Sequence, residues 1–407
     1  MIRVLIADDS AFMRMVLSDM FKKQPDFEVV GVAVNGKDAV EKCKSLNPDL
    51  VTMDVNMPVM DGLQALGQIM KDCPTPVIMF SSLTRDGAKA TIEALSLGAV
   101  DFVSKVGGSI SKVDTVEDEI LSKARTAVGA KGIIRKAAAA PPPPPPPPMP
   151  EPKPEPAPPK PEAAPTPPPE SEPKESPSAP PTMRRIQLPL RGGGTAAPPP
   201  PKRFTPRAVP AARTVSSGGS GRKLVVLGCS TGGPKALQSV VPMLPRNLPC
   251  GVLIVQHMPP GFTKSLADRL DEISQISVKE AENHDIIEAG HVYIAPGNYH
   301  MTVANGGREI LLNQDPPIGT LRPAADVLFK SAAPLGGNIV SVILTGMGSD
   351  GAIGMTEIKK TGGYVIAESE ETAVVYGMPK AVVDRGLADE IKPLQAIAGA
   401  IVHAVSH

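Results

Sequence analysis

A serine, a histidine and an aspartate in the C-terminal half of the chain are the residue types of a nucleophilic triad. Ser230 stands in the stretch Gly228–Gly232, whose G-x-S-x-G pattern can present a serine hydroxyl at a strand-to-helix turn. Glycines there also let a backbone approach a phosphate, so the stretch alone leaves a nucleophile and a phosphate-binding loop both open. His257 and Asp350 each follow a later apolar run. Together the three residues predict nucleophilic acyl-transfer chemistry.

Each residue of this set also has a structural interpretation. A lone histidine after a strand is often a structural hydrogen-bond donor, and an aspartate between glycines is often a turn residue. Cys229 is either a competing nucleophile or a small buried residue. The combination favours the triad, with His257 as the base and Asp350 on its other ring nitrogen. The chain order Ser, His, Asp is not that of the α/β-hydrolases, so that fold is not predicted.

A second group of polar residues lies at the ends of expected strands in the N-terminal half. Asp8 and Asp9 end the first strand, Asp54 ends the third, Ser81 ends the fourth and Lys105 follows the fifth. The carboxyl ends of strands in an open α/β sheet line one crevice, so we expect these side chains to converge. Crowded carboxylates need a cation, and oxygen ligands at an open site suit Mg²⁺. The set predicts phosphoryl transfer to Asp54; the alternative is that the acids only cap the following helices.

Alternating apolar runs and helical segments position these residues. In the N-terminal half the expected strands are 4–7, 28–34, 50–53, 77–80 and 101–103, and the expected helices are 11–23, 36–46, 63–71 and 88–97. In the C-terminal half the expected strands are 224–227, 252–256, 291–295, 339–345 and 364–367, with helices from 234, over 261–272, after Asp350 and over 399–405, and a hairpin within 301–312. Both halves therefore predict a parallel sheet covered by helices.

Proline divides the chain. Most of the 48 prolines lie between Ala137 and Ala212. Proline fixes φ and lacks an N–H, so this segment predicts a disordered, partly polyproline linker, or alternatively a ligand for proline-binding domains. The predicted domains are a first domain over 1–125, a tail helix and linker over 126–220, and a second domain over 221–407.

The composition excludes several classes. Lys plus Arg equals Asp plus Glu at 42 each, which gives no sign of a nucleic-acid or acidic-membrane partner. The four cysteines have no CxxC spacing and predict reduced thiols in the cytoplasm. We expect no signal peptide and no membrane insertion, because no apolar run reaches about 18 residues. A DNA-binding regulator is disfavoured, since the second domain reads as α/β without a basic recognition helix.

The first domain resembles the response-regulator receiver domains of two-component signalling. The stretches VLIADDS, TMDVNMPVMDG, IMFSS and GAVDFVSK carry the resemblance over about residues 1–125. It implies a sensor histidine kinase as phosphodonor and Mg²⁺ as the cofactor of phosphorylation only. The residues it implies are Asp54 as phospho-acceptor, Asp8 and Asp9 as metal-pocket acids, Asn56 as a backbone-carbonyl ligand, Ser81 and Lys105 as phosphate sensors, and Phe102 as the aromatic switch.

The second domain resembles the catalytic domain of the chemotaxis protein-glutamate methylesterases. GCSTGGPKAL, VQHMPPGFTKSLADRLD, GHVYIAPGNYHM, RPAADVLFKSAA, LTGMGSDGA and YGMPKAVVDRGL carry the resemblance over about residues 222–400. It implies Ser230, His257 and Asp350 as catalytic residues, an oxyanion-hole N–H in the loop of Met347, and Thr231 beside the nucleophile. It also implies demethylation of γ-glutamyl esters on methyl-accepting chemoreceptors with release of methanol, deamidation of receptor glutamines, and no cofactor for these reactions.

The two resemblances predict two doubly wound parallel-sheet domains, a flavodoxin-like receiver and a Rossmann-like esterase. In the family an unphosphorylated receiver packs over the catalytic crevice. The connecting segment here looks longer than usual, and effective concentration falls with linker length, so we expect weaker autoinhibition. The competing hypothesis is a phospho-switched binding protein whose second domain holds receptors without chemistry.

Overall fold

The computed structural model describes residues 1–82, 84–105, 113–139 and 223–406. Most of the linker predicted over 126–220 lies outside the described residues. The described residues up to 139 and from 223 onward belong to one compact unit, whose two sheets each form an α/β domain. Among the described helices, none combines the length and the apolar character needed to cross a membrane.

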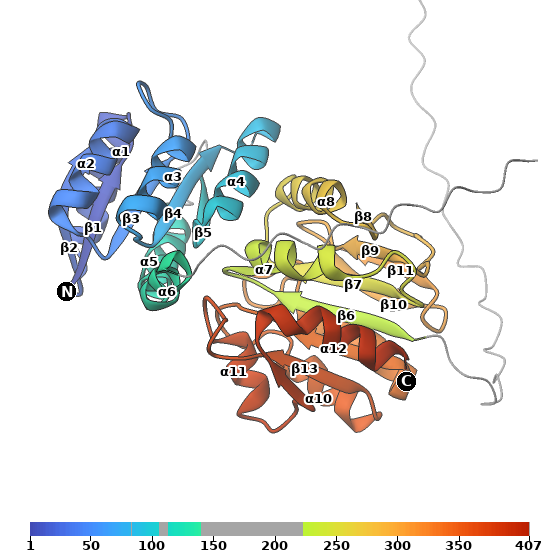
Figure 1. Cartoon of the computed structure of the whole chain (residues 1–407). Coiled ribbons are helices and arrows are strands. Elements are labelled where there is room, and N and C mark those ends of the chain that lie inside the picture. Colours follow the sequence, from blue (N-terminus) through green and yellow to red (C-terminus); the bar gives the residue numbers. More distant parts are fainter. Residues whose placement is uncertain (83, 106–112, 140–222, 407) are drawn as a thin grey trace, which may run out of the picture. The chain divides into compact units, whose positions relative to one another are not determined.

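The first domain is a five-stranded parallel sheet in the order β2-β1-β3-β4-β5 (Figure 1). Its strands are β1 Ile2–Ala7, β2 Phe27–Ala33, β3 Leu50–Asp54, β4 Val77–Ser82 and β5 Asp101–Lys105. Its helices are α1 Ala11–Lys22, α2 Gly36–Leu46, α3 Gly62–Asp72, α4 Arg85–Leu97, α5 Val113–Gly129 and α6 Lys131–Ala139. Four helices begin at side chains that accept a backbone N–H of the first turn, namely Ser10, Asn35, Asp61 and Thr84.

Both faces of this sheet are covered, as the apolar strands predict. Leu5 and Ala7 of β1 pack with the buried residues of α2, α3 and α4, whereas Val4 and Ile6 pack with those of α1 and α5. Successive side chains of a strand point to opposite faces, so an unbroken apolar strand must be buried on both sides.

The second domain is a seven-stranded parallel sheet in the order β14-β13-β12-β6-β7-β9-β8 (Figure 1). Its strands are β6 Leu224–Cys229, β7 Gly251–Gln256, β8 Ser277–Glu280, β9 His291–Ile294, β12 Ile339–Ile343, β13 Tyr364–Glu368 and β14 Glu390–Lys392. The expected hairpin is formed by the antiparallel pair β10 His300–Ala304 and β11 Glu309–Asn313.

Helices again cover both faces. They are α7 Gly233–Val240, α8 Phe262–Ile273, α9 Ala325–Ala332, α10 Ala352–Lys360, α11 Met378–Val383 and α12 Leu394–Ser406, with short 3₁₀ turns at Val241–Met243 and Ala333–Asn338. One face of β6, including Val225 and Leu227, packs with α7, α8 and α12. The other, including Leu224 and Val226, packs with α9, α10 and α11. The predicted fold class, two parallel-sheet α/β domains, is confirmed.

In each sheet the order of the strands reverses at the first strand, and this switch point determines where the crevice lies. In the first domain β1 stands between β2 and β3, and in the second domain β6 stands between β7 and β12. Ligands of open α/β sheets bind outside the carboxyl ends of the strands at such a switch point. The expected polar residues follow these same strands.

Four elements of the second domain were not predicted: β8, β14, α9 and α11. The last helix was predicted over 399–405 but begins at Leu394, because Gly399 was taken as its start and is instead an interior helical residue. A Cβ at Gly399 would meet no atom within 4 Å, so the glycine marks neither a turn nor a close approach.

Candidate active site

The second domain brings His257 and Asp350 into direct contact. His257 directly follows β7, and Asp350 lies in the loop between β12 and α10. Nε2 of His257 is 2.8 Å from Oδ2 of Asp350, and both side chains are more than nine-tenths buried. The carboxylate thus occupies Nε2 and leaves Nδ1 as the ring nitrogen able to accept a proton.

Backbone donors hold Asp350 in place. Its Oδ2 accepts the N–H of Ala325 at 2.5 Å, and its Oδ1 accepts the N–H of Asp326 at 3.0 Å. Burial raises the pKa of the Asp350 carboxyl, but the hydrogen bond and charge of His257 and the two backbone donors outweigh it. The net pKa lies below its ordinary value, so Asp350 is a carboxylate able to stabilise a protonated imidazole.

Ser230 follows the neighbouring strand β6, whose last residue is in register with Gln256 of β7. The N–H of His257 donates to the carbonyl of Cys229 at 3.2 Å, and the N–H of Ser230 donates to the carbonyl of Thr345 at 3.0 Å. The backbone of Ser230 is therefore bonded to the loop after β12, and the end of β6 before it is bonded to the backbone of His257. The predicted triad residues stand at three adjacent strand ends, β7, β6 and β12.

Small residues are required around this serine. Gly232 has φ +79°, in the left-handed region, and a Cβ there would lie 2.7 Å from the Cβ of Val374. A Cβ on Gly346 would lie 2.3 Å from the Sδ of Met378 and 2.9 Å from the Cβ of Ser230. Because larger residues would displace the serine or its neighbours, the glycines serve the turn and the close approach of the two loops.

The sequence interpretation missed Gln256, the buried last residue of β7. Its Nε2 donates to the carbonyl of Ser230 at 3.0 Å and to that of His257 at 3.3 Å. Its Oε1 lies 3.0 Å from the Sγ of Cys229. Burial raises the pKa of the Cys229 thiol well above its ordinary value, which fits the small buried residue rather than a competing nucleophile. The available signal was a polar residue ending an apolar strand.

The residues predicted near the oxyanion take different positions. Thr231 is buried, and its carbonyl accepts the hydroxyl of Thr345 at 2.9 Å. Met347 lies in the loop after β12 with its side chain 41% exposed. Their roles toward an oxyanion stay predictions.

Side chains of the first domain contact this region. The hydroxyl of Thr231, next to Ser230, donates to Oδ2 of Asp101 at 2.5 Å. The ring of Phe102, the predicted switch aromatic, is stacked on Phe262 with centroids 4.6 Å apart. The residue beside the proposed nucleophile is thus bonded to β5 of the first domain.

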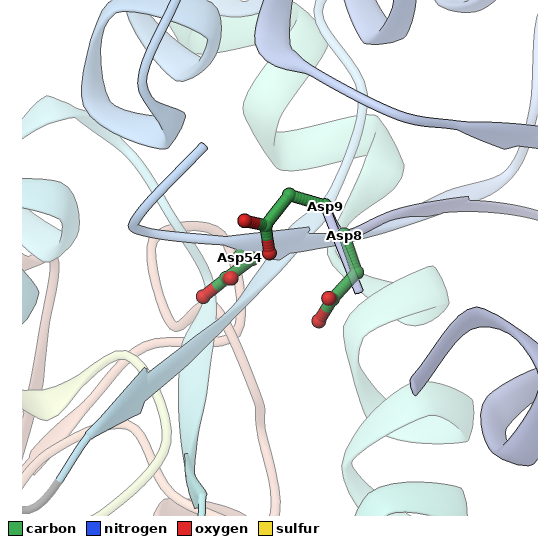
Figure 2. Close-up of side chains that lie close together, drawn as sticks. All are labelled: Asp8, Asp9 and Asp54. Carbon is green, nitrogen blue, oxygen red and sulfur yellow. The ribbon is translucent and has the colours of Figure 1, made fainter. Parts of the chain in front are cut away.

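The acidic residues of the first domain converge as predicted. Ligand oxygens of Asp8, Asp9 and Asp54 lie within 4.8 Å of one another, and Figure 2 shows the three carboxylates together. Asp8 and Asp54 are buried, and Asp9 is exposed. All three donors are carboxylate oxygens, and one of the three residues is exposed, which fits Mg²⁺.

Lys105 pairs with two of these acids. Its Nζ lies 2.8 Å from Oδ2 of Asp54 and 3.0 Å from Oδ2 of Asp8. Burial, the largest effect, raises the pKa of the Asp54 carboxyl above its ordinary value although Lys105 opposes it. A backbone N–H of Asn56 also bonds this carboxyl. The ion pairs likewise raise the pKa of Lys105 despite its burial.

Ser81 is fully buried at this end of β4, where its hydroxyl donates to the carbonyl of Gly87 at 2.9 Å. The predicted contact of Ser81 with a phosphate, the carbonyl of Asn56 as a metal ligand and the switch role of Phe102 all stay predictions.

Comparisons with known proteins divide the chain in the same way. Residues 225–401 match the family model described as CheB methylesterase, and residues 4–112 match the one described as response regulator receiver domain. The protein-glutamate methylesterase/protein-glutamine glutaminase of Symbiobacterium thermophilum is 46% identical over 408 residues, which cover 99% of this chain and 97% of that protein. The protein of the same name from Pyrococcus abyssi is 42% identical and covers 99% and 94%. The crystal structure of the Thermotoga maritima CheB methylesterase catalytic domain is 47% identical with a TM-score of 0.44, covering 45% of this chain and 98% of that one.

Proposed function

This chain belongs to the CheB methylesterase family and carries a response regulator receiver domain, and on that premise we propose a phosphorylation-regulated serine hydrolase. Its substrates are γ-glutamyl methyl esters of methyl-accepting chemoreceptors, from which it releases methanol, and specific receptor glutamines, which it deamidates. The hydrogen bond between His257 and Asp350 beside the strand that ends at Ser230 is the observation that carries the proposal.

The reaction follows from the roles of three side chains. The hydroxyl of Ser230 attacks the ester carbonyl while Nδ1 of His257 accepts its proton, and Asp350 on Nε2 stabilises the charged ring. Backbone N–H groups in the loops of Thr231 and Met347 receive the oxyanion, an effect worth about 3–4 kcal/mol per donor in other hydrolases. As the tetrahedral intermediate collapses, the imidazolium protonates the departing methoxide oxygen, which leaves as methanol. His257 then accepts a proton from a water molecule, which attacks the acyl carbonyl. As the bond between the acyl group and Ser230 breaks, His257 gives this proton to the Ser230 oxygen.

Phosphorylation of Asp54 by a sensor histidine kinase regulates this reaction. Asp8, Asp9 and Asp54 would hold Mg²⁺, which supplies charge neutralisation for an incoming phosphoryl group. Lys105 is already bound to Asp54 and Asp8, so it can move to a phosphoryl oxygen at short range. Because Thr231 is bonded to Asp101 of the receiver, a change at the phospho-acceptor has a physical route to the residue beside the nucleophile.

The test is methanol release from methylated chemoreceptor fragments by the full-length protein, with and without a small phosphodonor and Mg²⁺. We expect release that the phosphodonor increases. Ser230→Ala abolishes release yet leaves receptor binding intact, whereas Ser239→Ala, which changes an exposed serine of α7, retains full activity. Receptor binding without any methanol release by the wild type would instead favour a phospho-switched binding protein.

A further inference from the structure

Glu368 is a buried carboxyl group that the proposed reaction does not use. It is the last residue of β13 and is 1% exposed. An acidic side chain is rarely buried unless it has partners, so its contacts indicate why it is there.

Two hydrogen bonds engage this carboxyl. Its Oε2 accepts the N–H of Thr345 at 2.8 Å, and its Oε1 accepts the hydroxyl of Thr372 at 3.0 Å. Burial raises its pKa to about 7, although both hydrogen bonds act in the opposite direction. The group thus changes charge near neutral pH.

Among the described residues, no cationic side chain forms an ion pair with the Glu368 carboxyl. Lys392 of β14 is in register with Glu368, but its Nζ pairs with Glu390 at 3.2 Å. The charge of Glu368 adds to the effect of burial in raising the pKa of the Cys229 thiol on β6. The carboxylate therefore depends on the two hydrogen-bond donors.

Thr345 connects Glu368 to the nucleophile. Its carbonyl accepts the N–H of Ser230 at 3.0 Å. Its hydroxyl donates to the carbonyl of Thr231 at 2.9 Å and accepts the N–H of Val375, also at 2.9 Å. One residue thus binds the backbone on both sides of the Ser230–Thr231 peptide, and Glu368 binds the N–H of that residue.

We propose that Glu368 is a positioning residue for Ser230 that acts through Thr345. A carboxylate is an acceptor for the N–H of Thr345 that brings no competing donor, and its charge strengthens that hydrogen bond. The same carboxyl fixes Thr372, whose hydroxyl accepts the N–H of Leu394 at the start of α12. Glu368 thereby joins the ends of β12 and β13 and the segment after β13 into one support for the serine loop. This inference rests on Ser230 being the nucleophile of the proposed function.

The two protonation states of Glu368 differ in how firmly they hold Thr345. In the carboxylate, both oxygens accept charge-assisted hydrogen bonds. In the acid, the proton must be donated to Thr372, and Thr345 keeps only a neutral acceptor. Glu368→Gln therefore resembles the acid: it preserves size and an acceptor for Thr345 but removes the charge.

The experiment measures the rate at which a fluorophosphonate probe labels Ser230 in the full-length protein between pH 6 and 8, a readout that needs no receptor. At pH 8 we expect Glu368→Gln to slow labelling about tenfold, since charge-assisted hydrogen bonds are roughly twice as strong as neutral ones. At pH 6 the difference should nearly vanish, because the wild-type carboxyl is then protonated. In methanol release the same variant lowers kcat and leaves KM unchanged. Glu371→Gln, which changes an exposed glutamate of the same segment, has no effect.

A second variant keeps the inference testable should Glu368→Gln fail to fold. Thr372→Val removes a hydrogen bond that lowers the pKa of Glu368. The pH midpoint of the labelling rate should therefore be higher in this variant than in the wild type. Three results would overturn the inference. They are labelling of Glu368→Gln at the wild-type rate at pH 8, slowing of this variant by the same factor at pH 6 and pH 8, and a Thr372→Val midpoint equal to that of the wild type. Normal labelling behaviour without any methanol release would overturn the proposed function alone.

Discussion

Asp350 binds His257 through Nε2 at 2.8 Å, while the same carboxyl oxygen accepts the backbone N–H of Ala325. The carboxylate is therefore oriented by the backbone at the N-terminus of α9, and it in turn orients the imidazole. In the proposed reaction Nδ1 is then the ring nitrogen that exchanges a proton with Ser230, and this role determines what removing the charge of Asp350 should do.

Asp350→Asn should lower kcat for methanol release by about 10⁴-fold with little change in KM, as loss of the carboxylate does in another serine hydrolase. The amide can present its N–H₂ to Nε2 and so favours the wrong imidazole tautomer. Initial rates on methylated receptor fragments measure the effect. Asp315→Asn alters an exposed aspartate of the same domain and should retain full activity. More than a tenth of wild-type kcat in Asp350→Asn would contradict the assigned role.

The receiver site should accept phosphate only with a divalent cation. The full-length protein incubated with acetyl phosphate and Mg²⁺ should acquire one phosphoryl group and faster methanol release. Chelation with EDTA should block both, because Lys105 alone then offsets the charge of three carboxylates and the incoming phosphoryl group. Asp54→Asn should abolish both the acquisition of the phosphoryl group and the increase in methanol release. Asp19→Asn, at an exposed position of α1, serves as the control and should behave like the wild type. Activation of Asp54→Asn by the phosphodonor would contradict the assignment.

The sequence predicted most of the parallel sheets, because unbroken apolar strands and capped helices leave strong local signals. The bounds of α2, Gly36–Leu46, agree with the prediction, and its cap residue Asn35 is visible in the sequence. By contrast, the first turn of α9 is capped by Asp350, which is distant in the sequence, and not by its own N-cap residue Ala324. β14 has only three residues, so neither element has a local signature.

In the candidate site too, residues with a local sequence signal could be predicted, whereas residues that depend on tertiary contacts could not. Ser230, His257 and Asp350, the proposed catalytic residues, follow strands and could be singled out from that position. Gln256, Thr345 and Glu368 could not, because their importance comes from tertiary partners. The sequence signal for Gln256 and Glu368 is limited to their position as polar residues at the end of apolar strands.

The length of the proline-rich segment should limit autoinhibition. Deleting residues 150–199 from the full-length protein shortens the connection between the domains. If docking of the receiver on the catalytic domain limits basal activity, the effective concentration rises about fivefold by the −3/2 power of length, and unphosphorylated activity should fall by up to about that factor. Methanol release without phosphodonor measures this.

Asp101→Asn provides the matched background for that deletion. It removes the charge from the hydrogen bond with Thr231, so basal activity should rise and the linker deletion should then have little effect. An unchanged basal activity after deletion in the wild-type background would mean that linker length does not limit docking.

The pH dependence of stability should carry the signature of Glu368. The folded-state pKa of about 7 lies above the ordinary value of 4.5, so between these values the folded protein binds a proton that the unfolded chain has released. The stability that Glu368 contributes is therefore present below pH 4.5, is lost as the pH rises to 7, and is constant above. Relative to Glu368→Gln, the free energy of unfolding of the wild type should fall by about 3 kcal/mol across this range. Urea unfolding at pH 5 and pH 8 measures the difference, with Glu371→Gln as the control. A constant difference between wild type and Glu368→Gln at the two pH values would show that the carboxyl does not titrate in this range.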